Sequence, residues 1–178
     1  MLTARPVTGD FPDIEKLDAL AAEAFPPEER IAPRRLIEMA EADDFDFWAL
    51  CRGDEFAGFM AVMTHGSMAY LFFLAIEGAL RSKGCGAEAV ALLKTLYPGK
   101  TQVVDLEMPD DRAENSAQRI RRRAFYTRCG YRATGQFLSY LGVDYEVLCM
   151  DGGFDPAAFR ELMRGIRIDG FSPRYFTR

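Results

Sequence analysis

The apolar residues of this chain fall into strand-like and helix-like stretches, a pattern that predicts a mixed fold. Phe45–Cys51, Phe56–Thr64 and Tyr70–Ile76 are short apolar or aromatic runs separated by turn residues. Because only tight turns join these three runs, we expect them to pair as antiparallel strands. The last run is continuously apolar, which is typical of a strand covered on both faces.

A helix follows the third strand, because apolar residues recur at helical spacing from Ala89 to Tyr97. The next strand is predicted at Gln102–Met108. A helix between two strands of one sheet makes a crossover connection, so we expect Gln102–Met108 to lie parallel to Tyr70–Ile76.

The remaining elements follow from the same patterns. In chain order they are a strand at Leu2–Val7, helices from Asp10 or Pro12 to about Phe25 and from about Pro33 to Glu41, a helix at about Asn115–Arg128, strands at Gln136–Leu141 and Asp144–Met150, and a helix at about Pro156–Gly165. We expect one α/β (α+β) domain over residues 1–178, with its core in 2–150 and a C-terminal helix and tail in 151–178. Its sheet would be mixed and mostly antiparallel, with a central parallel pair and flanking helices.

Composition narrows the class of protein. Hydrophobic residues make up 49% of the chain and its net charge is −5, which favours a packed domain over a nucleic-acid or membrane-surface protein. The four cysteines are widely separated and His65 is the only histidine, so neither a zinc site nor a disulfide framework is predicted. With no signal-peptide pattern and no apolar run of membrane length, we expect a cytoplasmic protein without a metal.

The segment between Ile76 and the following helix carries the first candidate chemistry. Gly84 and Gly86 lie where the helix begins, with Arg81 and Lys83 just before them. Glycines at a helix N-terminus let an anion approach unpaired N–H groups, so the segment is either a phosphate-binding loop or only a connecting turn.

Two carboxylates and a polar helical stripe form the second candidate site. Asp105 and Glu107 share one face of an otherwise apolar strand, unless that strand is an edge facing water. On the helix at 115–128, one stripe consists of Asn115, Arg119, Arg122 and Tyr126. The opposite side carries the residues we expect to face the core, namely Ala117, Ile120 and Ala124. The arginines could equally form a solvated face.

Two motifs together resemble the GCN5-related N-acetyltransferase (GNAT) family. The first is Arg81-x-x-Gly84-x-Gly86 after an aromatic and aliphatic strand, and the second is Tyr126 followed by Gly130-Tyr131. The order of elements from Leu2 to Met150 is also similar. The resemblance implies acetyl-CoA as the acetyl donor and the primary amine of a small molecule as the acceptor.

The resemblance also implies which residues hold the donor. The strand-end backbone that would pair with the pantetheine arm belongs to Leu74, Ala75 and Ile76. The loop whose backbone N–H groups would hold the pyrophosphate consists of Arg81, Ser82, Lys83, Gly84, Cys85, Gly86 and Ala87. Asn115 would lie near the pantetheine, and Arg119 and Arg122 are candidates for contact with CoA phosphates.

Acetyl transfer to an amine needs a base for the ammonium and an acid for the departing thiolate. By resemblance, Tyr126 would stand near the thioester sulfur as the acid. Glu107 is our candidate base, with Asp105 helping to bind the acceptor's positive charge. The segment at 25–30 is similar to one that borders the acceptor site in some family members, so Glu28, Glu29 and Arg30 are candidate substrate contacts.

Three alternatives remain open at this stage. A non-catalytic acetyl-CoA sensor or interaction module would keep the loop without turnover. An NAD-dependent oxidoreductase is suggested by the G-x-G-x-x-A spacing of Gly84, Gly86 and Ala89, although residues 77–83 interrupt the tight turn that such a fingerprint needs. A homodimer could form through the late strands and the tail.

Overall fold

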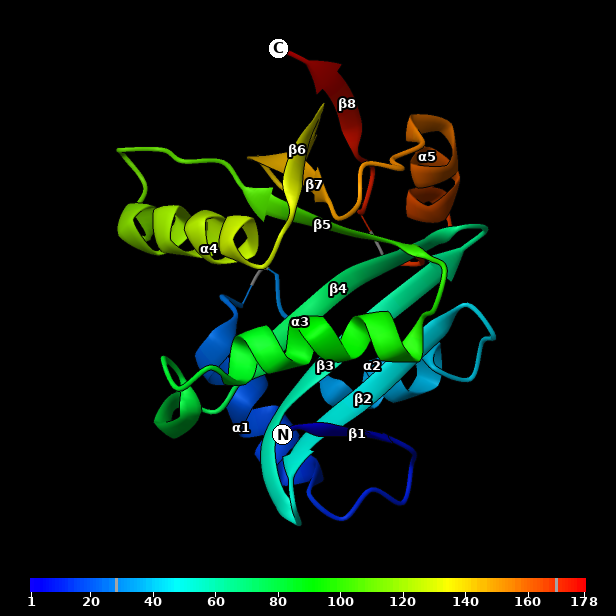
Figure 1. The fold of residues 1–178 in the computed structure, drawn as a ribbon, viewed down its shortest axis with the longest axis vertical. Coiled ribbons are helices and arrows are strands. Elements are labelled where there is room, and N and C mark those ends of the chain that lie inside the picture. The colour runs from blue at the N-terminus through cyan, green and yellow to red at the C-terminus, as the bar shows by residue number, and fades with distance from the viewer. Residues whose placement is uncertain (28, 169) are drawn as a thin grey trace. The chain divides into compact units, whose positions relative to one another are not determined.

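The computed structural model describes residues 1–27, 29–168 and 170–178 of the chain (Figure 1). The strands in these residues are β1 (Thr3–Pro6), β2 (Phe45–Arg52), β3 (Glu55–His65), β4 (Met68–Ile76), β5 (Thr101–Glu107), β6 (Arg132–Tyr140), β7 (Val143–Cys149) and β8 (Arg174–Thr177). The α-helices are α1 (Ile14–Ala24), α2 (Pro33–Met39), α3 (Cys85–Leu96), α4 (Ser116–Arg128) and α5 (Pro156–Arg164), and η1 (Gly78–Leu80) is a short 3₁₀ helix.

The strands form a mixed sheet in the order β1-β2-β3-β4-β5-β7-β6-β8. β4 and β5 are parallel, with Tyr70 opposite Val103, as the crossover through α3 requires. The pairs β1–β2, β2–β3, β5–β7, β6–β7 and β6–β8 are antiparallel. The predicted fold class is therefore confirmed. Because β5 lies between β4 and β7, the alternative that β5 is an edge strand is wrong.

The chain divides into two compact units. Unit 1 comprises Met1–Thr64 and Leu71–Pro98, and unit 2 comprises His65–Tyr70 and Gly99–Arg178. β4 thus contributes its first residues to unit 2 and the others to unit 1. Our expectation of one domain over residues 1–178 stays a prediction.

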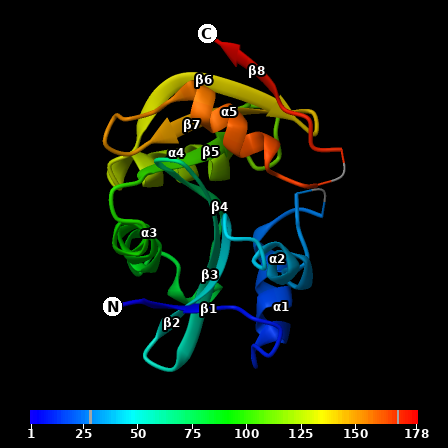
Figure 2. The ribbon, with the colours of Figure 1, turned by 90° about the vertical axis from the view of Figure 1, so that its right-hand side faces the viewer.

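In unit 1, helices cover both faces of the strands. Figure 2 shows α3 on one side of β2 and β3, and α1 and α2 on the other. The apolar faces of these helices are buried through Leu17, Leu36 and Leu93, each at most 1% exposed. This burial is the main source of their stability, since α1 and α3 start without a side-chain cap.

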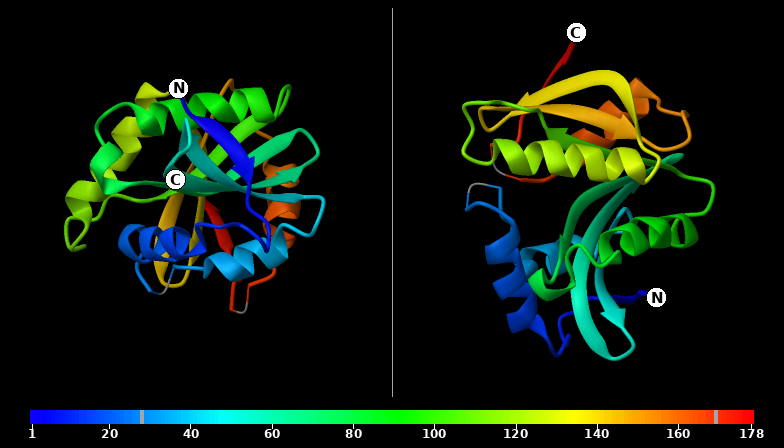
Figure 3. Two further views of the ribbon diagram at one scale, coloured as in Figure 1. Left: turned by 90° about the horizontal axis from the view of Figure 1, so that it is seen from below. Right: turned by 60° about the vertical axis from the view of Figure 1, so that its left-hand side comes forward.

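In unit 2, α4 and α5 lie on opposite sides of the strands (Figure 1), and α4 runs alongside them in the right-hand view of Figure 3. The α5 side is packed by Phe159, whose ring centroid lies 5.9 Å from that of Tyr70. Asp155 caps α5 by accepting hydrogen bonds from the N–H groups of Ala157 and Ala158 at 2.9 and 3.3 Å. Beyond α4, the hydroxyl of the buried Tyr131 donates to Gln102 Oε1 at 3.1 Å.

Most predicted elements are confirmed within a few residues, with two exceptions in the late part of the chain. β6 starts at Arg132 rather than Gln136, with an irregular register between Ala133 and Phe137. β8 was not predicted, because its four residues have neither a strong pattern nor a local partner; they pair with β6, where Phe176 lies opposite Phe137.

Candidate active site

The segment between β4 and α3 belongs to unit 1 and has an irregular backbone. Residues 78–80 form η1, and the Arg81 N–H bonds back to the Glu77 carbonyl at 3.2 Å. Ser82 and Gly84 then adopt left-handed φ angles of 60° and 85°. Gly84 is the N-cap residue of α3, and its positive φ explains why a glycine suits this position.

The backbone N–H groups that follow have no partner among the described residues. They belong to Ser82, Lys83, Gly84, Cys85, Gly86 and Ala87, and the next N–H, that of Glu88, bonds to the Gly84 carbonyl at 3.0 Å. Gly84 has no side chain with which to cap α3. A run of unpaired N–H groups at the positive end of a helix is a favourable place for an anion.

The side chains of this loop fix its ends. Arg81 donates from Nε to the Ile76 carbonyl at 2.8 Å and pairs with Glu23 of α1 at 2.7 Å. Cys85 is fully buried and its sulfur lies 3.2 Å from an Arg52 nitrogen. The guanidinium of Arg81 therefore ties the loop to β4 and α1, which leaves its backbone, and the exposed Lys83, for a ligand.

Leu74, Ala75 and Ile76 form the end of β4, where β3 comes unusually close. A Cβ atom on Gly58 would lie 2.2 Å from the Ala75 carbonyl oxygen, so only glycine fits there. Gly58 is a residue that we did not predict to matter. Sequence alone gives no signal for it, because the close approach is between strands.

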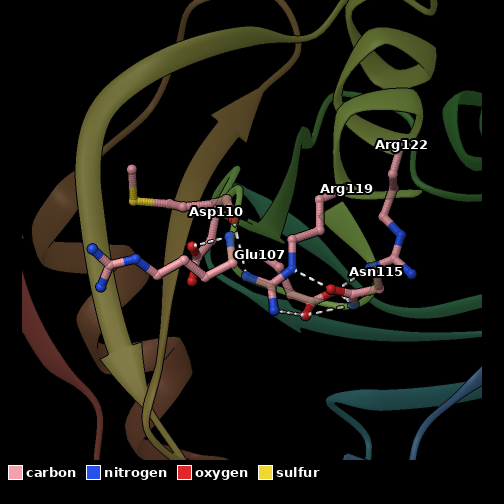
Figure 4. Close-up of polar contacts among 7 residues, drawn as sticks. Glu107, Asp110, Asn115, Arg119 and Arg122 are labelled. Carbon is pink, nitrogen blue, oxygen red and sulfur yellow. Dashed lines mark hydrogen bonds and ion pairs between the residues drawn. The ribbon is translucent and has the colours of Figure 1, made fainter. Parts of the chain in front are cut away.

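Glu107, at the end of β5, lies in a compact cluster with α4 (Figure 4). It is 6% exposed. Its carboxylate pairs with Arg119 at 2.9 Å and Arg122 at 3.0 Å. It also accepts hydrogen bonds from Asn115 Nδ2 at 3.1 and 3.3 Å.

Arg119 uses all of its nitrogens within this cluster. Besides Glu107, it donates to Asn115 Oδ1 at 2.7 Å and to the Met108 carbonyl at 3.0 Å. Nearby, Asp110 accepts the Arg112 N–H at 2.9 Å (Figure 4). The structure thus brings Glu107, Asn115 and both arginines together, and the expected contact of the arginines with CoA phosphates stays a prediction.

The expected orientation of α4 is wrong. Ala117 and Ala124 are exposed and Ile120 is 52% exposed, whereas Tyr126 is buried. The reason is electrostatic: β5 and β7 present Glu107 and Glu146, so the polar stripe of α4 turns toward the strands. Arg123 pairs with Glu146 at 2.6 Å in the same way.

Tyr126 is 6% exposed and packs edge-on against Phe125 and Tyr131, with centroids at 5.0 and 5.3 Å. Among the described residues its hydroxyl has no hydrogen-bond partner. Burial raises the pKa of Tyr126 well above its ordinary value, while the positive charge of Arg122 lowers that pKa in part. The phenol is therefore protonated at neutral pH and available as a donor.

Asp105 has partners quite different from those of Glu107. Its carboxylate accepts the hydroxyl of Tyr70 at 2.6 Å and that of Tyr140 at 3.0 Å. Burial raises the pKa of this carboxyl, and the two hydroxyls lower it in part. Tyr70 and Tyr140 were not predicted as site residues, since they lie on strands remote in sequence.

The candidate acceptor contacts at 28–30 lie in unit 1. Glu28 is outside the described residues. Glu29 and Arg30 follow α1 in a turn in which both of their N–H groups bond to the Pro26 carbonyl at 3.1 Å. Their role toward a substrate stays a prediction.

The described residues contain neither a metal-binding cluster nor a membrane-spanning helix. No group of three or more histidine, cysteine or acidic side chains is arranged to hold a metal ion within residues 1–27, 29–168 and 170–178. In the same part of the chain, no helix is long and apolar enough to cross a membrane.

Comparison with known proteins identifies the family of this chain. The model of the acetyltransferase (GNAT) family matches residues 14–131. That match spans more than half of the sequence, so the chain belongs to the GNAT family. A comparison with curated proteins found no match.

Solved structures share the fold. A GNAT-family protein from Bacteroides thetaiotaomicron has a TM-score of 0.69 at 22% identity, covering 89% of this chain and 92% of that one. Aminoglycoside 6'-N-acetyltransferase from Enterococcus faecium has a TM-score of 0.62 at 16% identity, with 86% and 99% covered. A Bacillus subtilis acetyltransferase in complex with CoA has a TM-score of 0.55 at 16% identity, with 85% and 99% covered.

Proposed function

We propose that this protein is an acetyl-CoA-dependent N-acetyltransferase that acts on the primary amine of a small molecule. The observation that carries the proposal is the run of N–H groups from Ser82 to Ala87 at the start of α3, which have no partner among the described residues, in a chain of the GNAT family. CoA is a ligand of the Bacillus subtilis relative, and its pyrophosphate is an anion of the kind such a run binds.

The proposed donor site uses the backbone of unit 1. The N–H groups of the loop hold the pyrophosphate, and the strand end at Leu74–Ile76 pairs with the amides of the pantetheine arm as an added strand would. Backbone recognition explains why the loop contains glycines and why the Arg81 side chain is free to anchor its ends.

The proposed chemistry is direct transfer. The acceptor nitrogen forms a bond to the acetyl carbonyl carbon, the carbon–sulfur bond breaks, and Tyr126 gives its proton to the departing thiolate. Support for this acid comes from the buried, protonated phenol with no hydrogen-bond partner among the described residues. The base assigned from the sequence is Glu107, and its pairing with two guanidinium groups makes the choice of base a separate question.

The test of the donor site is calorimetric titration of the full chain with acetyl-CoA, with NADH titrated in parallel. We expect acetyl-CoA alone to bind. Gly84→Glu should weaken that binding by about 100-fold or more, because it places a negative charge at the proposed phosphate site.

Gly99→Glu is the matched control. Gly99 also has a positive φ, of 76°, with nothing within 4 Å of an added Cβ, but it follows the opposite end of α3. The affinity of the Gly99→Glu variant for acetyl-CoA should equal that of the unchanged chain. Equal affinity in the Gly84 variant would remove the phosphate assignment, and binding of NADH alone would favour the oxidoreductase.

A further inference from the structure

We propose that Asp105 and the tyrosines around it bind the acceptor as a primary ammonium carried on an aromatic or apolar body, and that Asp105 takes its proton. This inference rests on the proposed function and concerns its acceptor side. All of the residues that carry it lie in unit 2.

The first step is the state of the two carboxylates of β5. Glu107 faces two guanidinium groups and an amide, all within 3.3 Å (Figure 4). The oxygens of this carboxylate are thus taken up by side chains of α4 and of its N-cap residue Asn115. Glu107 therefore acts as a positioning residue that holds the polar stripe of α4 against β5.

Asp105, in contrast, has neutral partners and keeps partial solvent exposure. The hydroxyls of Tyr70 and Tyr140 occupy one site on each carboxylate oxygen. An ionised carboxylate has about four acceptor sites, so about two remain for the N–H groups of an ammonium. No ion pair to Asp105 is present among the described residues, so an incoming cation can neutralise its negative charge.

The aromatic surroundings of Asp105 indicate what the cation is attached to. Tyr140 stacks on Tyr145 with a centroid distance of 4.1 Å and an interplanar angle of 2°. Phe171 meets Tyr140 edge-on at 5.0 Å. Tyr145 is buried, whereas the rings of Tyr140 and Phe171 are partly exposed. Partly exposed rings beside a carboxylate favour a cation next to aromatic or aliphatic carbon, through ring contact and cation–π attraction.

Residues of unit 2 account for each proton that moves in the proposed acetyl transfer. The ammonium gives one proton to Asp105, which later releases it to water. After the new nitrogen–carbon bond forms, the nitrogen loses a second proton. That proton restores Tyr126, which has given its own to the thiolate. The net products are the acetylated amine, the CoA thiol and one proton.

The other titratable groups near Asp105 do not compete with it between pH 5 and 8, roughly the range in which a base of this kind works. Burial raises the pKa of Tyr70, Tyr140, Tyr126 and Tyr175, which face it from β4, β6, α4 and β8. Tyr145 stands behind Tyr140 on β7, and α5 contributes Arg160, which lies over the Tyr175 ring at 5.1 Å.

The experiment compares the full chain with Asp105→Asn and Glu107→Gln. Calorimetric titration uses 2-phenylethylamine hydrochloride as the probe and 2-phenylethanol as its neutral match. We expect the amine to bind more tightly than the alcohol, and Asp105→Asn to weaken amine binding by about 10-fold to 100-fold. Asp144→Asn, which changes a partly exposed carboxylate of unit 2, should leave binding unchanged.

The second measurement is the pH dependence of thiol release with the same amine at saturating acetyl-CoA. Asp105→Asn should lower kcat/KM by about 100-fold and remove the acidic limb of the profile. Glu107→Gln should lower kcat/KM by the same factor at every pH and leave the acidic limb in place. Loss of the acidic limb in Glu107→Gln would mean that Glu107, and not Asp105, is the base.

Thermal unfolding and acetyl-CoA titration of each variant identify a folding defect. Absence of amine binding to the unchanged chain, or equal binding of amine and alcohol, would overturn the acceptor proposal. Absence of acetyl-CoA binding would instead overturn the proposed function, and the amine titration would still decide the role of Asp105.

Discussion

Asp105 and Glu107 are two residues apart on one strand, yet their environments give them different chemistry. Glu107 is neutralised by Arg119 and Arg122, whereas the side chains that hydrogen-bond to Asp105 are the neutral hydroxyls of Tyr70 and Tyr140. Paired carboxylates with distinct environments are a common way to assign separate roles to similar groups. The role of each carboxylate therefore depends more on the side chains around it than on whether the residue is Asp or Glu.

The raised pKa of Asp105 gives a stability prediction. The folded chain holds this proton more tightly than the unfolded chain, in which the pKa is near 3.8. The free energy of unfolding should therefore fall as pH rises from about 4 through the folded pKa of Asp105. Chemical denaturation across pH should show this fall in the unchanged chain and a smaller one in Asp105→Asn; identical slopes would contradict the raised pKa.

Tyr126 gives a catalytic prediction at the same scale. Tyr126→Phe removes only the hydroxyl, so ring packing against Phe125 and Tyr131 should persist. We expect acetyl-CoA affinity within about twofold of that of the unchanged chain, and a kcat lower by at least about 100-fold. Steady-state kinetics check this, with Thr127→Val, which removes an exposed hydroxyl from the same helix, as the control. An unaltered kcat would mean that another group is the acid.

Among the elements, the end of β4 depends on a glycine of its neighbour. Gly58→Ala would put a methyl group 2.2 Å from the Ala75 carbonyl oxygen, so the strands must separate. We expect a loss of about 1–3 kcal/mol in the free energy of unfolding, together with weaker acetyl-CoA binding. Urea denaturation measures the first effect and calorimetry the second.

The control is Gly9→Ala, where an added Cβ meets nothing within 4 Å. It should change stability by less than about 0.5 kcal/mol. If Gly58→Ala were as harmless as this control, the close approach of β3 and β4 would not constrain the chain.

Element patterns were the most predictable part of the chain. Local apolar spacing and turn residues predicted every α-helix and β1 to β7, and two short motifs predicted the family. The orientation of α4 was not predictable, because the face of Arg119 and Tyr126 is buried by partners on β5 that no helical pattern reveals. The link from Asp105 to Tyr140, 35 positions away, escaped prediction for the same reason.

At the level of the whole molecule, we propose that the chain transfers an acetyl group to an amine. The proposed donor loop belongs to unit 1, and the candidate acid and carboxylates belong to unit 2. A non-catalytic acetyl-CoA module would need only the donor loop. Turnover, rather than binding, therefore separates the two readings of this fold.

The most direct measurement is release of CoA thiol from acetyl-CoA by the full chain, with and without a panel of amines. The panel includes 2-phenylethylamine, spermidine, kanamycin and a short peptide with a free N-terminus, and mass spectrometry follows the acetylated product. We predict that thiol release depends on an amine and equals the amount of amide formed. Tight binding of acetyl-CoA with the same slow release in every mixture would rule out acetylation of these amines and favour the non-catalytic module.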